Sequence, residues 1–288
     1  IMPESSTFRF SEFGGSLRWD FDSRVLSLTT PVNSDCDSKA REMLKENKDK
    51  TIASLVAEFG EDQFEAKKAN FIDLGPKKFS VLGFHNRFYE QARRAFVVGA
   101  YYPSLVGACA LGERILNHLL LALRDDYRSE PSYKKVYRKS SFDDWALAID
   151  TLEEWGVLEV NASDAFRALM EKRHSAIHFR PETDTNDRQL ALEALQCLGE
   201  VIAYQFAGAG LLPWFLNDIA GEVYIRQEWE KKPFIQKVYL HSCARVGPWH
   251  EVVEVHPKWK IRDRFPYEDR EISDDEFVRL RKEGPSPS

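Results

Sequence analysis

The chain has few of the features that mark secreted, membrane-spanning or disulfide-stabilised proteins. Its four cysteines, Cys36, Cys109, Cys197 and Cys243, are widely dispersed and form no CxxC pair, which argues against a disulfide scaffold or a zinc ribbon. No uninterrupted apolar run is long enough to span a bilayer, and no apolar stretch of the signal-peptide kind follows the first residues. We therefore expect a cytoplasmic protein that makes no membrane contact.

An excess of positive charge is also absent. The 40 lysines and arginines are outnumbered by 46 acidic residues, so the formal net charge is -6. Any contact with nucleic acid must then use a local basic patch, because the protein as a whole has no attractive field for polyanions. The chain contains no P-loop, dinucleotide fingerprint, Gly-x-Ser-x-Gly elbow or HExxH motif. We expect no bound cofactor and no resident metal.

The chain has 288 residues, of which 43% are hydrophobic and 12% are aromatic. This length and composition are sufficient for one large hydrophobic core or for two to three modest domains. Alternating apolar residues predict strands between residues 5 and 30, before two charged helical stretches at 38–48 and 51–70. Strand-like patterns return after Leu211. They cover Val238 to Leu240, residues 246–249, residues 251–255, and the surroundings of Trp259 and Ile261.

Between these ends the pattern is helical and poor in turns. The expected helices cover residues 86–100, 103–126, 143–155, 163–179 with Ser163 as N-cap, and 187–206. Amphipathic helices joined by short connections are typical of an antiparallel bundle. We therefore predict an α+β protein with a central antiparallel helical bundle at 83–210. It is flanked by an N-terminal mixed α/β module at 1–82 and a small C-terminal β module at 211–288.

The segment Arg173-His174-Ser175-Ala176-Ile177-His178 carries the clearest chemical signal. A guanidinium grips phosphate with a planar fork, and a histidine moves protons at neutral pH, so Arg173 and His178 have the minimum equipment for cutting RNA without a metal. They lie about 140° apart around an α-helix. His174 and His178 are better aligned for a metal, which would need a third ligand such as His118, Cys109 or Glu113. Arg173 as a surface residue and His178 as a helix C-cap form the non-functional alternative.

The region from about residue 86 to 208 resembles a HEPN domain (higher eukaryotes and prokaryotes nucleotide-binding). Three features carry the resemblance: the RHSAIH motif near the end of a late helix, the upstream helix PSLVGACALGERILNHLLLAL with an acidic residue among apolar ones, and a closing helix after a polar break. The resemblance covers somewhat under half of the chain. It implies a metal-independent endoribonuclease that is a homodimer through the helical bundle, with two motifs facing each other in a cleft.

The resemblance also implies roles for individual residues. Arg173 would hold the scissile phosphate, and His178 would move a proton to or from the 2′-hydroxyl or the leaving oxygen. His174 would occupy the polar position of the motif, and Glu113, on the upstream helix, would support the arginine. Attack by the 2′-hydroxyl restricts the substrate to RNA and leaves a cyclic phosphate. By family analogy the setting is a toxin or an antiviral-defence effector, with an antitoxin or regulatory protein as a further partner.

A second candidate region interleaves tyrosines with basic residues. We expect its stacking faces and cations to bind single-stranded RNA, although a solvated loop is the alternative. These RNA-binding candidates are Tyr133, Lys134, Lys135, Tyr137, Arg138 and Lys139. The tryptophans Trp145, Trp155 and Trp214 are expected in the core or an interface.

The function predicted from the sequence is thus RNA cleavage. The first alternative is a catalytically inactive HEPN-like module for dimerisation or nucleotide sensing, and the second is a metallohydrolase that uses His174 and His178.

Overall fold

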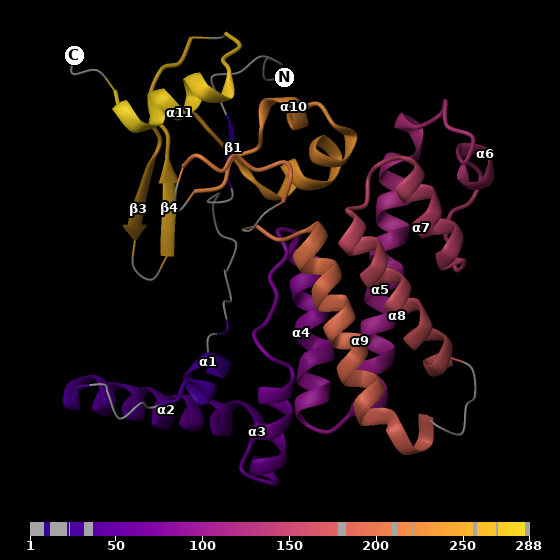
Figure 1. Cartoon of the computed structure of the whole chain (residues 1–288), viewed down its shortest axis with the longest axis vertical. Coiled ribbons are helices and arrows are strands. Elements are labelled where there is room, and N and C mark those ends of the chain that lie inside the picture. The colour runs from indigo at the N-terminus through magenta and orange to yellow at the C-terminus, as the bar shows by residue number, and fades with distance from the viewer. Residues whose placement is uncertain are drawn as a thin grey trace.

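The computed structural model describes residues 9–11, 22, 24–31, 37–177, 183–208, 212–219, 222–255, 258–268 and 270–285. In these residues the chain is mostly helical, with a small two-stranded antiparallel sheet near the C-terminus (Figure 1). The predicted C-terminal strands at 251–255 and around Trp259 and Ile261 are confirmed, since they form this sheet.

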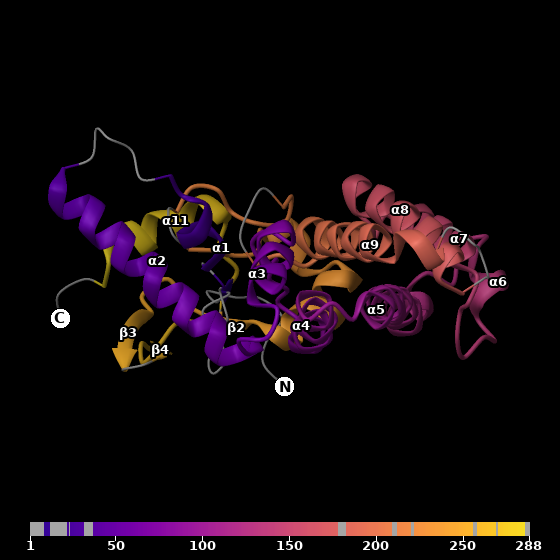
Figure 2. The same cartoon turned by 90° about the horizontal axis from the view of Figure 1, so that it is seen from below.

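The centre of the molecule is a bundle of packed helices, in which long helices that follow one another along the chain run in opposite directions (Figure 1). Its members are α4 (Gly83–Val97), α5 (Tyr101–Leu123), α7 (Trp145–Glu154), α8 (Val160–Ile177) and α9 (Thr183–Gln205). Seen from below, α4 and α5 lie side by side in one layer and α8 and α9 in a second (Figure 2). The five helices expected between residues 86 and 206 are confirmed, with shifted ends.

Helix α5 lies at the heart of this bundle because apolar residues recur along it every three or four positions. Leu105, Leu116 and Leu120 are at most 1% exposed, and the helix packs against α4, α7, α8 and α9. Together with the following 3-10 turn η1 (Arg124–Asp126), it is apolar and long enough to cross a membrane, and half of that stretch is buried inside the protein. A core helix of a folded domain has the same properties.

The N-terminal region differs from the prediction in two places. Residues 24–29, expected as strand, form helix α1 (Arg24–Thr29), because Val25 and Leu28 are buried together at helical spacing against α2 (Ser38–Phe59). The two predicted helices at 38–48 and 51–70 are divided elsewhere: α2 continues to Phe59, and α3 (Phe64–Asp73) follows. Gly60, whose φ of 78° is accessible to glycine without strain, ends α2.

Two further predictions were wrong for reasons of packing. Ser163 does not cap α8, which begins at Val160; the Ser163 side chain is buried, and its Oγ has no hydrogen-bond partner among the described residues. Val238 to Leu240 are not a strand but lie in a π-helical turn η2 (Ile235–Tyr239) and the start of η3 (Leu240–Ser242). Tyr239 packs there against Trp214 and other aromatic rings, so tertiary contacts override its strand preference.

The C-terminal region joins the two ends of the chain. Its elements are α10 (Gln227–Glu230), β2 (Ala244–Val246), β3 (Glu251–Val255), β4 (Lys258–Arg262) and α11 (Asp274–Glu283). Strand β1 (Arg9–Ser11) pairs antiparallel with β2, and β3 pairs with β4. The buried Arg9 guanidinium donates to Glu230 at 2.8 Å and to the carbonyl of Ile272 at 2.8 Å. These contacts link the N-terminal strand to residues more than 200 positions away.

Gly112 is the position where α5 tolerates no side chain. A Cβ atom there would lie 2.6 Å from Cη2 of Trp145 and 2.7 Å from Cδ2 of Leu169. Gly112→Ala should therefore lower the free energy of unfolding by about 1–2 kcal/mol, because overpacking outweighs the gain in helix propensity. Gly107→Ala, on the same helix, is the control: its Cβ would lie 3.4 Å from that of Ala92. Urea denaturation should find the control neutral or stabilised, and equal effects would contradict the steric argument.

Candidate functional site

Arg173, the arginine of the sequence motif, lies on α8 opposite Glu113 of α5. Its Nη2 is 3.0 Å from Oε2 of Glu113, and the two side chains are 17% and 38% exposed. Glu113 is the one carboxylate within ion-pair distance of Arg173 in the described part of the chain. The structure thus brings together two residues that the sequence had singled out on helices 60 positions apart.

Trp145, the first residue of α7, completes this arrangement. Its Nε1 donates to the same Oε2 of Glu113 at 3.2 Å, and the Arg173 Cζ lies 5.6 Å from the centre of its ring. Trp145 itself is 2% exposed, and it reaches this position because Gly112 leaves room beside α5. The carboxylate and the ring together hold the guanidinium in a fixed orientation. We call Glu113, Trp145 and Arg173 the arginine triad.

A thiol lies one helical turn before Glu113. Burial raises the pKa of Cys109 to about 12, although the nearby positive charge of Arg173 favours the thiolate. Cys109 is therefore a protonated, buried thiol at neutral pH, which makes it a poor nucleophile.

The histidines of the motif are described in part. His174 follows Arg173 on α8 and is half-buried. His178 lies outside the described residues, since the description of α8 ends at Ile177. The 140° offset between Arg173 and His178 and the pairing of His174 with His178 stay predictions. In the described part of the chain no three histidine, cysteine or acidic side chains are placed to hold a metal ion together.

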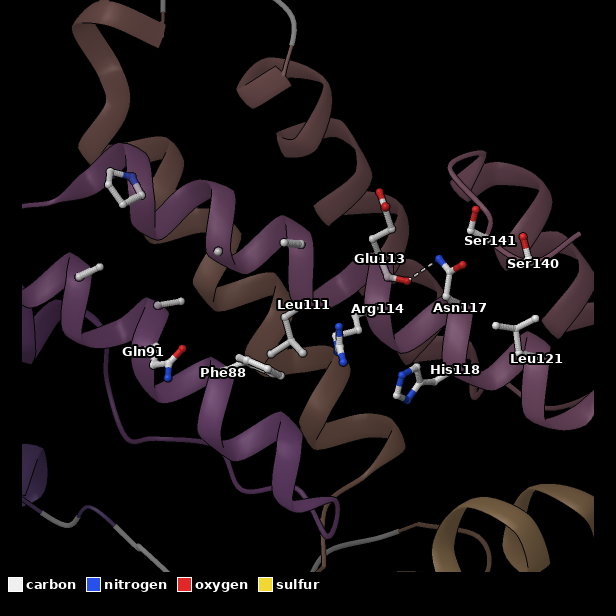
Figure 3. A pocket seen from close by; sticks show the side chains of 15 residues that line it. Phe88, Gln91, Leu111, Glu113, Arg114, Asn117, His118, Leu121, Ser140 and Ser141 are labelled. Carbon is white, nitrogen blue, oxygen red and sulfur yellow. Dashed lines mark hydrogen bonds between the residues drawn. The ribbon is translucent and has the colours of Figure 1, made fainter.

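Glu113 also borders an open groove of about 740 Å³ between α4 and α5 (Figure 3). Small residues such as Ala95 and Gly107 line part of it, while Arg114 and His118 extend from the α5 side. The Arg114 guanidinium lies over the ring of Phe88, 5.4 Å from its centre. The sequence analysis missed this groove, because it exists only where two helices meet. A hint was the row of polar residues Glu113, Arg114, Asn117 and His118 within an otherwise apolar helix.

Asn117 fixes the far rim of the groove. Its Nδ2 donates to the carbonyl of Phe142 at 2.9 Å, and its Oδ1 accepts from the amide of Phe142 at 2.7 Å. This double hydrogen bond imitates a strand pair and ties the loop before α7 to α5. Ser140 and Ser141 consequently border the groove (Figure 3).

The tyrosine-rich basic segment is folded onto the bundle, around the short helix α6 (Tyr133–Val136). Tyr127 stacks on Trp155, with ring centres 4.8 Å apart, so that face is occupied. Arg124 donates to the carbonyls of Val136 and Lys139, which anchors the end of the segment beside the groove.

The candidates themselves remain accessible. Lys134, Lys135, Arg138 and Lys139 are exposed. Tyr137 is 39% exposed, and the Arg138 guanidinium covers one side of its ring at 5.0 Å. Tyr133 is half-buried, 5.5 Å from Tyr137 between ring centres. The segment thus presents cations and one open aromatic edge.

Comparisons with protein families, with curated proteins and with solved structures found no match to this chain.

The arginine triad predicts different costs for two substitutions of Glu113. Glu113→Gln keeps an acceptor for Trp145 and removes only a half-exposed ion pair, so the free energy of unfolding should fall by less than about 1 kcal/mol. Glu113→Ala also leaves the indole N–H without its partner, which should cost about 1–2 kcal/mol more. Urea denaturation measures both, and the difference should vanish in a Trp145→Phe background. Its persistence there would contradict the indole hydrogen bond.

Proposed function

We propose that this protein is a metal-independent endoribonuclease, and that its helical bundle at 83–210 is a HEPN-like domain between N-terminal and C-terminal modules. The observation that carries the proposal is the arginine triad. An arginine of a motif typical of metal-independent ribonucleases is half-buried and is oriented by an indole and by a carboxylate that borders an open groove. A surface arginine without a role needs no such support.

The chemistry follows from the residue types. Arg173 holds the scissile phosphate and stabilises the charge that grows on it in the transition state. The 2′-oxygen bonds to phosphorus while the bond from phosphorus to the 5′-oxygen breaks. His178 moves the proton from the 2′-hydroxyl or to the departing 5′-oxygen. His174 contacts phosphate or water, and Glu113 is a positioning residue that acts through Arg173.

We also propose that the active form is a homodimer through the helical bundle. Large apolar side chains on the outer side of α5 support it, since Tyr102, Val106 and Leu121 are 54%, 39% and 37% exposed. A second copy placed there would cover them. The toxin or antiviral-defence setting, with an antitoxin or regulatory protein as partner, extends the same family analogy.

Cleavage of RNA by single-residue variants tests the chemistry. Arg173→Ala and His178→Ala should each lower the rate by at least about 10²-fold, because each removes charge stabilisation or proton transfer from the transition state. Arg167→Ala is the matched control: this arginine lies on the same helix but pairs with Asp150 and Glu153 of α7. It should retain full activity.

The nature of the product separates this mechanism from its alternatives. Cleaved RNA should end in a 2′,3′-cyclic phosphate, EDTA should have no effect, and a substrate with 2′-deoxyribose at the cleavage site should stay intact. Activity that EDTA abolishes and zinc restores would instead support a metal site at His174 and His178. Absence of cleavage in purified protein that binds RNA would favour an inactive HEPN-like module.

The basic segment predicts how RNA binding depends on salt. Reversing the charges of Lys134, Lys135, Arg138 and Lys139 should weaken binding and flatten its dependence on salt concentration, since fewer counterions are released. The control reverses four exposed cations on α2, Lys39, Arg41, Lys45 and Lys48. Fluorescence anisotropy at several salt concentrations measures both sets. Equal changes in RNA affinity and salt dependence for the two sets of variants would mean that the segment acts only through the net charge of the protein.

A further inference from the structure

A second, smaller cavity lies at the end of the bundle, where the starts of α4 and of η3 meet the ends of α5 and α9. Its volume is about 160 Å³. An apolar cavity of about 150 Å³ is known to accept one benzene ring. The cavity therefore has room for a single six-membered ring. It does not include Arg173 or Glu113, so its role is separate from the proposed ribonuclease site.

Aromatic rings form much of the wall. The His85 ring meets the Phe84 ring edge to face, with centres 4.3 Å apart, and meets Phe206 in the same way at 4.6 Å. Phe84 also contacts His118, 4.8 Å between ring centres. Two phenyl rings thus pack directly against His85, and the aromatic surfaces favour a planar occupant.

His85 gives the cavity a hydrogen-bond donor. It is 1% exposed, and its Nδ1 lies 2.8 Å from Oγ of Ser80. This oxygen also accepts from the amide of Leu82 at 3.1 Å, and Nδ1 is the one acceptor found for the Ser80 hydroxyl among the described residues, so we assign the hydroxyl proton to Nδ1. Burial lowers the pKa of His85 to about 3, so the ring is neutral at physiological pH and carries its proton on Nε2.

Among the described residues His85 makes one hydrogen bond, through Nδ1, and its Nε2 is not among the fully buried side-chain atoms without a partner. Nε2 is therefore open to the cavity that His85 lines, where it can donate to an acceptor on a ligand in place of water. The residue that supplies the donor lines the cavity, and its other nitrogen is occupied. The structure therefore contains a cavity and, in its wall, a hydrogen-bond donor whose orientation is already fixed.

The other polar groups around the cavity select the charge of the occupant. They are His118, His241 and Lys237, and no acidic side chain lines the cavity in the described part of the chain. Lys237 is turned to Asp126, whose two carboxylate oxygens lie 2.8 and 2.6 Å from its Nζ. Burial and the charge of Arg114 both lower the pKa of His118. The lining offers N–H donors without an anion, which disfavours a cationic ligand.

We propose that this cavity is a binding site for a small, uncharged, planar heterocycle that carries a hydrogen-bond acceptor and is about the size of one pyrimidine ring. The acceptor bonds to Nε2 of His85, and the ring lies against Phe84 and Phe206. His118 borders both this cavity and the groove between α4 and α5.

Three probes built on one six-membered ring test the proposal: 2-pyridone, benzene and N-methylpyridinium. Saturation-transfer NMR with the full chain should detect 2-pyridone, with benzene about tenfold weaker because it lacks the acceptor and N-methylpyridinium absent because of its charge. The ¹⁵N resonance of His85 Nε2 should shift only with 2-pyridone. Equal binding of 2-pyridone and benzene would overturn the role of His85. No binding of any probe at millimolar concentration would overturn the site and leave ordered water as its occupant.

Two variants locate the site. His85→Phe keeps the ring and removes the donor, so 2-pyridone should bind about tenfold more weakly while benzene is unchanged. Ala122→Trp places a large side chain at the exposed lining position on α5 and should abolish binding of both without touching the core. Its matched control is Ala110→Trp, an exposed alanine on the same helix that lines only the groove. Binding unaffected by Ala122→Trp, or lost equally in Ala110→Trp, would contradict the proposed location.

Discussion

Trp145 approaches α5 so closely that the helix must have a glycine at position 112. The rest of the candidate site depends on this contact. With the indole seated there, its N–H reaches Glu113, the next residue along α5, and its ring lies under the guanidinium of Arg173. The same ring packs into the bundle core against Phe166. The packing of Trp145 in the core therefore also sets the orientation of the Arg173 guanidinium. A change in the core at Trp145 would displace this arginine.

The two sides of helix α5 have different roles in the bundle. Most of its leucines are buried in the core, while its groove side carries Glu113, Arg114, Asn117 and His118. Glu113 belongs to the arginine triad, and Arg114 lines the groove. Asn117 bonds to the loop at Phe142, and His118 lines the smaller cavity. Because a helix is rigid over this length, the four features keep fixed spacings. A ligand bound at one of these four features therefore lies at a fixed distance from the other three.

Positively charged side chains lie near the helical bundle although the net charge of the whole chain is negative. The formal net charge is -6, yet Arg114 at the groove has no acidic partner among the described residues, and exposed lysines and an arginine follow in the segment that ends at Ser140. Acidic residues elsewhere are engaged in ion pairs such as those of Arg281 with Glu222 and of Arg9 with Glu230. A local attractive field for phosphate at the bundle is thus compatible with an acidic protein.

The sequence by itself determined the helices of the bundle, because apolar residues at a spacing of three or four encode a buried helix face whatever it packs against. It also singled out Arg173 and Glu113 by residue type. Only the tertiary structure decided that Glu113 shares its oxygen with Trp145, that α2 runs unbroken to Gly60, and that Tyr239 is helical rather than extended. Each of these depends on contacts between residues far apart in the chain, and a local pattern holds no information about such partners. The groove and the smaller cavity are likewise spaces between elements, so they came into view only when the elements were packed.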